Sequence, residues 1–139
     1  MVRLARHEDW RRVLELFKAC HAASVYDDPL CADSCAVLFN EAVKGHQLAC
    51  FVTPEVDGAL FLALTPSHFN LNTLYANELM FWGKGGRELV KAGAGWAKAR
   101  GARRLRIASE HHIKGKVMDR WYRREGFSPV GRTYAMELE

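Results

Sequence analysis

The sequence predicts a mixed α/β fold, and three observations lead to that prediction. The chain has 139 residues, of which 49% are apolar and 26% are charged, a composition that suits one domain with a buried core. Apolar residues recur at helical spacing in some segments and form strand-like runs in others. A glycine cluster joins one such run directly to a helix. We therefore expect a single domain over residues 1–139, with a mixed sheet of about six or seven strands flanked by about four helices.

Helical periodicity and turn residues predict the order of helices and strands in the N-terminal half. Trp10, Val13 and Phe17 recur on one helix face, and a good N-cap, Asp33, begins a second helix that Gly45 ends. Strand-like runs follow, and the Pro-Glu-Val-Asp-Gly segment between two of them is typical of a hairpin turn. The elements expected here are a strand at 2–5, helices at 7–23 and 33–44, and strands at 48–53, 59–65 and 73–82.

The C-terminal half alternates helices with strands. Gly101 ends the helix that follows the glycine cluster, and Leu105 and Ile107 are the apolar positions of the next strand. A strand–turn–helix–strand unit is parallel and right-handed, and its ligand crevice lies where its strands end, here at Trp82 and Ser109. The elements expected here are a helix at 86–100, a strand at 103–109, a helix at 115–125 and a strand at 129–137.

Charge and cysteine content narrow the class of protein. The net charge of +4 suits either a polyanionic partner or a phosphorylated cofactor and does not choose between them. No apolar run is long enough to span a membrane, and residues 1–6 lack the apolar core of a signal peptide, so we expect a cytoplasmic protein. No two of the four cysteines form a C-x-x-C pair, which favours reduced thiols and no metal site.

The glycine cluster at residues 83–86 is the strongest local signal in the chain. Glycine lets the backbone approach a ligand closely, and the first turn of the helix after it has N–H groups without intrahelical acceptors. Together with the helix dipole, these groups form a site for an anion such as a pyrophosphate. A tight strand-to-helix turn without a ligand is the other interpretation.

Element order and two motifs resemble the GNAT superfamily of acyl-CoA-dependent N-acyltransferases. The segment Gly-Gly-Arg-Glu-Leu-Val at 85–90, with the helix end and strand at 97–107, is similar to the cofactor-binding motif of that family. The segment 121–131, which contains Tyr122, an arginine pair and Gly-Phe, is similar to its closing signature. These motifs cover the C-terminal half, whereas element order alone supports the N-terminal half.

The resemblance implies acetyl-CoA, or another acyl-CoA, as the acyl donor. In that family the strand before the glycine turn splays from its parallel neighbour, the pantetheine arm lies in the gap, and the turn holds the pyrophosphate. The residues implied for cofactor binding are Leu79, Met80, Phe81, Trp82, Gly83, Lys84, Gly85, Gly86, Arg87 and Ser109. The turn is shorter than the family's pattern and keeps Gly86 as its last anchor, with Lys84 and Phe81 at the other two anchor positions.

Two residues are candidates for proton transfer. Glu78 begins the strand run beside the cofactor, at a position where some family members carry a catalytic glutamate, and is a candidate base. Tyr122 matches the tyrosine of the closing signature and is a candidate acid for the departing thiolate. The structural alternatives are an ion-paired glutamate at a sheet end and a tyrosine packed beside Trp121 and Phe127.

The acceptor site is expected between the N-terminal helices and the central strands. Tyr26, His68 and Phe69 lie in loops that can line it, and His111 follows the strand at the end where the site should open. The acceptor is a primary amine of a small molecule, a protein or a nucleic acid. Many members of the family are dimers, so a homodimer is expected.

A catalytically inactive structural or interaction protein with the same fold is the alternative function. Small proteins of this kind occur in bacteriophages, some as virion components or DNA modifiers, which leaves a phage-type member, and a virion location, open. A nucleic-acid base-modifying acyltransferase is a further alternative. No aromatic and basic strand motif of a known RNA-binding family is present.

Overall fold

A computed structural model describes residues 1–108, 115–131 and 133–138. The chain divides into two compact units, Met1–Ala108 and Ser109–Glu139. Among the described residues, no helix is long and apolar enough to cross a membrane.

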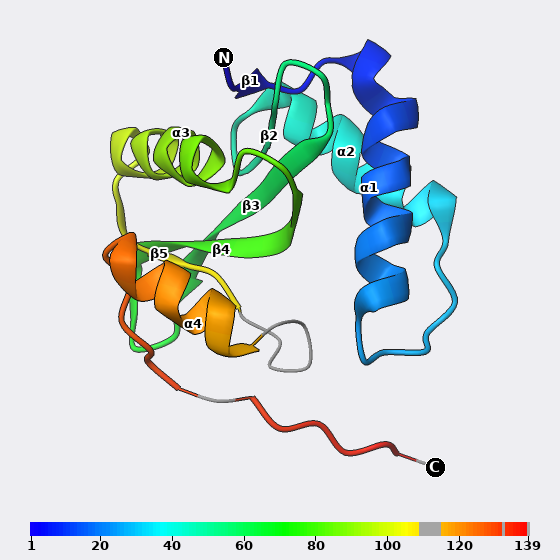
Figure 1. Cartoon of the computed structure of the whole chain (residues 1–139). Helices are drawn as coiled ribbons and strands as arrows, with labels where there is room; N and C mark the ends of the chain where they lie inside the picture. Colours follow the sequence, from blue (N-terminus) through cyan, green and yellow to red (C-terminus); the bar gives the residue numbers. More distant parts are fainter. Residues whose placement is uncertain (109–114, 132, 139) are drawn as a thin grey trace. The chain divides into compact units, whose positions relative to one another are not determined.

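The first unit is built on a five-stranded sheet in the order β1-β2-β3-β4-β5 (Figure 1). The strands are β1 (Arg3–Leu4), β2 (Leu48–Val52), β3 (Gly58–Ser67), β4 (Asn70–Gly83) and β5 (Ala102–Arg106). Neighbouring strands from β1 to β4 are antiparallel, and β4 and β5 are parallel. The predicted parallel strand–turn–helix–strand unit is therefore confirmed.

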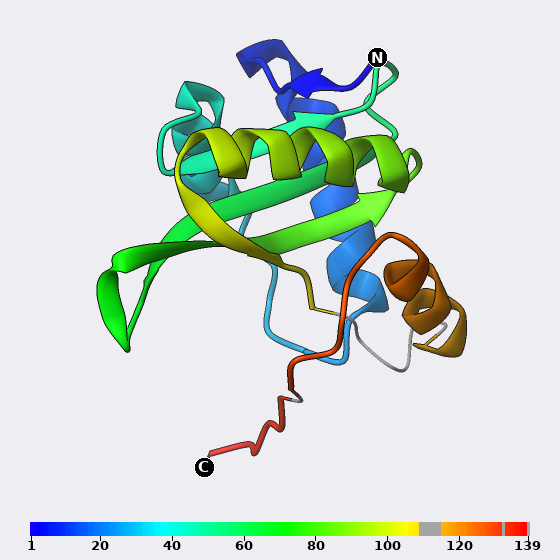
Figure 2. The same cartoon turned by 90° about the vertical axis from the view of Figure 1, so that its left-hand side faces the viewer.

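Helices cover both faces of this sheet. A 3₁₀ turn (His7–Asp9) leads into α1 (Trp10–Ala23), and α1 and α2 (Ala32–Lys44) lie on the face opposite to α3 (Gly86–Ala99) (Figures 1 and 2). A first core cluster joins α1 and α2 to the sheet through Val13, Phe39 and Phe61, all at most 1% exposed. A second cluster joins α3 to the sheet through Leu60, Leu62 and Leu89, each 0% exposed.

Close packing fixes α3 on β3. A Cβ atom placed on Gly93 would lie 2.9 Å from a methyl carbon of both Leu60 and Leu62, so a larger residue has no room there. The indole of Trp96 donates a hydrogen bond to the carbonyl of Gly45 at 3.2 Å. Gly45 ends α2, as predicted, and has the left-handed conformation. These contacts fix the direction in which α3 begins, and therefore the position of the glycine turn.

The structure corrects the predicted strand count and several boundaries. We expected about six or seven strands, and the described residues contain five. The predicted last strand at 129–137 is wrong for the described part of this segment, which has no secondary structure and whose Val130, Tyr134 and Met136 are 81–85% exposed. Pro129 lacks an N–H donor, and the alternation of apolar residues alone forms no strand without a hydrogen-bonded partner. The strands predicted at 59–65 and 73–82 are longer than expected, since β3 ends at Ser67 and β4 begins at Asn70, so that most of the loop expected between them is strand.

Candidate active site

The end of β4 is the most distinctive backbone feature of the first unit. The last residue pair between β4 and β5 is Asn77 with Arg106, although β4 continues to Gly83 beside β3. Figure 2 shows the chain after β5 turning away from the end of β4. Six residues of β4, Glu78–Gly83, therefore have a strand on one side only among the described residues, over about 20 Å. These six residues are called the parted edge of β4.

A β-bulge lies where the two strands part. Phe61 of β3 pairs with Met80, but the next residue, Leu62, pairs with Glu78, so Leu79 is an extra residue on β4. Bulges bend a strand and redirect side chains, and they often occur beside active sites. Here the bulge separates the part of β4 that pairs with β5 from the parted edge, and it leaves Leu79 46% exposed.

The glycine turn packs directly against the turn between β2 and β3. Gly83 and Gly85 have φ angles of 91° and 72°, a conformation that favours glycine. A Cβ atom on Gly83 would lie 2.2 Å from the carbonyl oxygen of Asp57, and one on Gly58 would meet the backbone of Lys84. Sequence reasoning left open both ligand approach and a tight strand-to-helix turn for the glycine cluster, and it placed Gly58 in a hairpin turn without relating that turn to the cluster.

The hairpin turn that supports the glycines has its own hydrogen bonds. The Thr53 hydroxyl donates to the Asp57 carboxylate at 2.6 Å and accepts from the N–H groups of Asp57 and Gly58 at 3.0 and 3.1 Å. The N–H of Lys84 in turn donates to the carbonyl of Asp57 at 3.0 Å. The Lys84 N–H is thus used within the protein and is not among the groups that face a ligand.

The N-terminus of α3 is the part of the turn suited to an anion. No side chain caps it, and its N-cap residue, Gly85, has a left-handed conformation. The first N–H groups of a helix have no intrahelical acceptor, and the helix dipole places partial positive charge there. Lys84 precedes this terminus and Arg87 lies in its first turn, and their exposed side chains add positive charge. These groups fit a phosphate or pyrophosphate.

The two candidate catalytic residues lie in different units. Glu78 is half-buried at the point where β4 and β5 part, next to the bulge. Tyr122 lies on α4 (Gly115–Arg124) of the second unit, half-buried, with ring centroids 5.2 Å from Trp121 and 5.4 Å from Phe127. The aromatic packing expected for Tyr122 is therefore present, and Glu78 shares its strand with the residues predicted for cofactor binding.

The predicted acceptor residues do not lie together on one element. Tyr26 is exposed in the segment between α1 and α2. His68 and Phe69 form the tip of the β3–β4 hairpin, with ring centroids 4.1 Å apart. This tip is at the opposite end of β4 from the glycine turn, about 25–30 Å from Glu78 along the strand. Ser109 and His111 lie outside the described residues.

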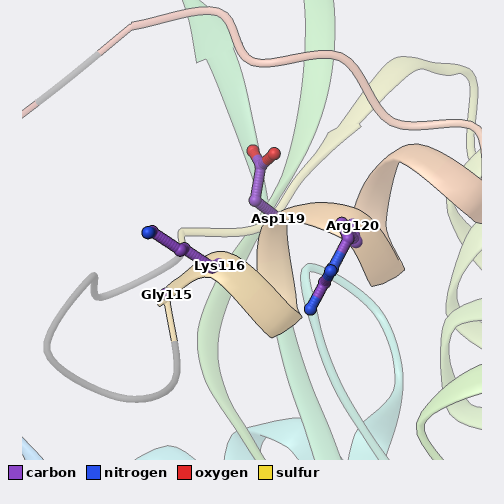
Figure 3. Close-up of a pocket in the computed structure, with 4 residues that line it drawn as sticks. All are labelled: Gly115, Lys116, Asp119 and Arg120. Carbon is purple, nitrogen blue, oxygen red and sulfur yellow. The ribbon is translucent and has the colours of Figure 1, made fainter.

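A hollow of about 460 Å³ in the second unit is lined by Gly115, Lys116, Asp119 and Arg120 of α4 (Figure 3). The three long side chains leave the helix in different directions and do not converge on a common point. The Asp119 carboxylate accepts a hydrogen bond from Arg123 at 2.9 Å. Among the residues that the structure describes, no group of three His, Cys, Asp or Glu side chains could hold a metal ion.

Solved structures share the fold of this chain. A putative acetyltransferase from Agrobacterium tumefaciens str. C58 matches with a TM-score of 0.75 and 18% identity, over 99% of each chain. AAC(6')-Iy, in complex with the bisubstrate analog CoA-S-monomethyl-acetylneamine, matches with a TM-score of 0.74 and 12% identity, over 100% of this chain and 97% of that one. Glucosamine-6-phosphate N-acetyltransferase from Arabidopsis thaliana matches with a TM-score of 0.72 and 12% identity, over 100% of this chain and 98% of that one.

The chain therefore has the fold of the GNAT acetyltransferases, which confirms the fold predicted from the sequence. No protein-family model matches the chain, and no curated protein matches its sequence. At identities of 12–19%, these structural matches establish the fold alone.

Proposed function

We propose that the protein is an N-acyltransferase that uses acetyl-CoA, or another acyl-CoA, to acylate a primary amine. The observation that carries this proposal is the parted edge of β4, which runs from Glu78 directly to the uncapped N-terminus of α3. One continuous segment thus offers an extended backbone edge, an anion site and a carboxylate. Structures of AAC(6')-Iy in complex with CoA and with a bisubstrate analog of CoA have this fold and support the choice of donor.

The donor would be held mainly by backbone groups. The edge residues Leu79–Trp82 would form strand-like hydrogen bonds with the amide groups of the pantetheine arm. The first turn of α3, from Gly86, would hold the pyrophosphate, with charge from Lys84 and Arg87. Bound in this way, acyl-CoA supplies an activated acyl group, and the chain's own residues must supply the proton transfers.

Glu78 and Tyr122 would carry these proton transfers. The neutral form of the primary amine attacks the thioester, and as the new C–N bond forms the Glu78 carboxylate would accept one proton from the nitrogen, directly or through a water molecule. A backbone N–H near Phe81 or Trp82 would donate to the negative charge that develops on the carbonyl oxygen. The Tyr122 hydroxyl would give a proton to the sulfur that leaves. The acyl group thereby moves from sulfur to nitrogen, with one proton lost by the amine and one gained by the thiolate.

Thiol release from acetyl-CoA, measured with a panel of amines, tests this proposal. We expect Glu78→Gln and Tyr122→Phe each to lower kcat by about a hundredfold, because general acid and base residues typically contribute that much. Glu15→Gln and Tyr134→Phe are matched controls, since Glu15 pairs with Lys18 on the surface and Tyr134 is 85% exposed. Unchanged rates in Glu78→Gln and Tyr122→Phe would remove both residues from the mechanism.

A binding protein without catalytic activity is the second candidate. The observation in its favour is that Gly58, Gly83 and Gly85 are explained by contact between two turns of the chain, without a ligand. In that case the glycine turn would be a structural remnant of the fold, and the protein would bind neither CoA nor acetyl-CoA. A calorimetric titration with CoA separates the two candidates.

A further inference from the structure

The turn between β2 and β3, residues 53–57, carries backbone strain at Val56. Val56 has a φ angle of 52°, and no other non-glycine residue in the part of the chain that the structure describes has a positive φ. This conformation is rare for a β-branched residue, and a strained residue persists only where its surroundings hold it. Such strain occurs mainly at functional sites, so this turn is a candidate for a functional role.

A single buried hydroxyl group joins the two ends of the turn. Thr53 is 6% exposed, and its Oγ1 donates to the Asp57 carboxylate at 2.6 Å. The same oxygen accepts hydrogen bonds from the N–H groups of Asp57 and Gly58, at 3.0 and 3.1 Å. One donated and two accepted bonds use the full capacity of a hydroxyl group. The Thr53 hydroxyl therefore maintains the conformation of the turn.

Two further contacts fix the turn from outside. Arg12 of α1 donates from Nη1 to the carbonyl of Glu55 at 2.8 Å. The Val56 side chain is 7% exposed and belongs to the core cluster that joins α1 and α2 to the sheet. Core burial and hydrogen bonds thus hold Val56 in its strained conformation.

The other side of the turn contacts the glycine turn. The N–H of Lys84 donates to the carbonyl of Asp57 at 3.0 Å. A Cβ atom placed on Gly85 would lie 2.7 Å from the Cγ2 methyl carbon of Thr53. Gly85 is the N-cap residue of α3, and its carbonyl accepts the helical hydrogen bond from Leu89 at 2.9 Å. Thr53 is therefore connected to the N-terminus of α3 by a methyl contact and by one intervening hydrogen bond.

An anion at a helix N-terminus is bound well only if the first N–H groups point at it. Hydrogen bonds weaken steeply when the angle at the hydrogen falls far below 150°, and a displacement of about 1 Å can cost about a hundredfold in rate. Glycines give a turn more backbone freedom than any other residue. The fixed geometry of the glycine turn must therefore come from the segment packed against it, which is the turn between β2 and β3.

We infer that Thr53 is a positioning residue for the acyl donor, because its hydroxyl holds the turn between β2 and β3 in the conformation that directs the N-terminus of α3 at the pyrophosphate. This inference rests on the proposed function, since it takes the pyrophosphate of acyl-CoA as the group bound there. The turn transmits the effect through its contacts with Lys84 and Gly85. It extends the donor site to a segment about 30 residues before the glycine turn.

Calorimetry with CoA, inorganic pyrophosphate and pantetheine tests the inference on two variants of Thr53. Thr53→Val keeps the methyl group beside Gly85 and removes the hydroxyl, whereas Thr53→Ser keeps the hydroxyl and removes the methyl group. We expect Thr53→Val to weaken the binding of CoA and of pyrophosphate by about tenfold, and Thr53→Ser to bind both like the wild type. Pantetheine lacks the pyrophosphate, so its binding should be the same in all three proteins.

Kinetics with acetyl-CoA separate a positioning role from a catalytic one. Thr53→Val should raise the KM for acetyl-CoA by about tenfold and leave kcat unchanged, which is the pattern of lost binding energy that is common to substrate and transition state. Thr53→Ser should restore the KM of the wild type.

Ser67→Ala is the matched control. Ser67 is also 6% exposed, and its Oγ accepts from the N–H of Phe69 in the turn at the other end of β3. The substitution thus removes a buried hydroxyl from a hairpin turn that lies away from the glycine turn. Urea unfolding should show a loss of stability in both variants, but only Thr53→Val should lose affinity for CoA.

Hydrogen exchange in the wild-type chain tests the inference without a substitution. Coupling between two sites is reciprocal, so a turn that favours binding is itself stabilised by binding. Saturating CoA should therefore slow exchange of the N–H groups of Asp57, Gly58 and Lys84 by about tenfold, the factor expected for the loss of affinity. Exchange of the Phe69 N–H, which is bonded to Ser67, should not change.

The outcomes separate this inference from the proposed function. No binding of CoA or pyrophosphate to the wild-type chain would overturn the proposed function and this inference together. Full retention of CoA affinity in Thr53→Val, or exchange at Lys84 that does not respond to CoA, would overturn the inference and leave the acyltransferase in place. An equal loss of pantetheine binding, or an equal loss of CoA affinity in Ser67→Ala, would also overturn it, because the effect would then be a general loss of structure.

Discussion

The packing of α3 on β3 predicts that one added methyl group has opposite effects on stability at two positions of α3. A Cβ atom at Gly93 would lie 2.9 Å from methyl carbons of Leu60 and Leu62, both 0% exposed, whereas one at Gly95 would meet nothing within 4 Å. Overpacking of a core costs about 1–3 kcal/mol, and replacing glycine by alanine inside a helix gains about 1 kcal/mol. We therefore expect Gly93→Ala to lower the free energy of unfolding by about 1 kcal/mol and Gly95→Ala to raise it by about as much.

The difference in the free energy of unfolding between the two variants measures the cost of overpacking alone, because the gain in helix propensity is common to both. That difference should be about 2 kcal/mol in urea unfolding followed by circular dichroism, or roughly 6–8 °C in Tm for a chain of this size. Equal m-values would show that both variants unfold from the same compact state. If Gly93→Ala proved as stabilising as Gly95→Ala, α3 would not be packed on β3 as described, and the position of its N-terminus would lose its support.

Two further predictions concern a buried ion pair and the cysteines. Arg3 donates two hydrogen bonds to the buried Asp9 carboxylate, at 2.7 and 3.0 Å, and these bonds hold the pKa of Asp9 below its usual value. The ion pair therefore stabilises the folded state above about pH 4, and this stabilisation is lost as the pH falls through the lowered pKa. Asp9→Asn should therefore lower the free energy of unfolding by about 2–4 kcal/mol at pH 7, and should make that free energy depend less on pH in the acid range, as measured by urea titrations. An unchanged dependence on acid pH would show that another group is responsible for it. Hydrogen bonds from Ser34 lower the pKa of the exposed Cys31 thiol, whereas burial raises the pKa of Cys50 to about 12. Iodoacetamide followed by mass spectrometry should label Cys31 first and Cys50 only after unfolding; early labelling of Cys50 would contradict its burial.

Most of the fold could be predicted from local patterns, because helical periodicity and glycine positions carry the information. The glycine cluster, Gly45 and Gly101 ended or began elements where expected. In α2, by contrast, Val37, Leu38 and Phe39 are all apolar, but Val37 and Leu38 are 64% and 40% exposed, while Phe39 at 1% lies in the core. Three consecutive apolar residues do not show which one faces the sheet until the helix is packed.

The parts of the site that could not be predicted depend on contacts between distant segments. The bulge at Leu79 exists only in the register between β3 and β4, and the approach of Gly58 to Lys84 joins two turns that are separate in sequence. The contacts of Tyr75 and Asn77 with Arg104 and Arg106 likewise depend on the cross-strand pairs of β4 and β5.

Binding of CoA to the wild-type chain, Gly86→Glu and Gly95→Glu by calorimetry tests the central claim most directly. Gly86 is the first residue of α3, so a carboxylate there would repel a pyrophosphate at the helix N-terminus. Gly95→Glu makes the same change on an open face of the same helix. We predict micromolar affinity, on the order of −8 kcal/mol, for the wild type and Gly95→Glu, and a loss of at least about tenfold for Gly86→Glu. No binding to the wild-type chain, or equal binding by all three, would contradict the claim that the glycine turn and the parted edge of β4 form an acyl-CoA site.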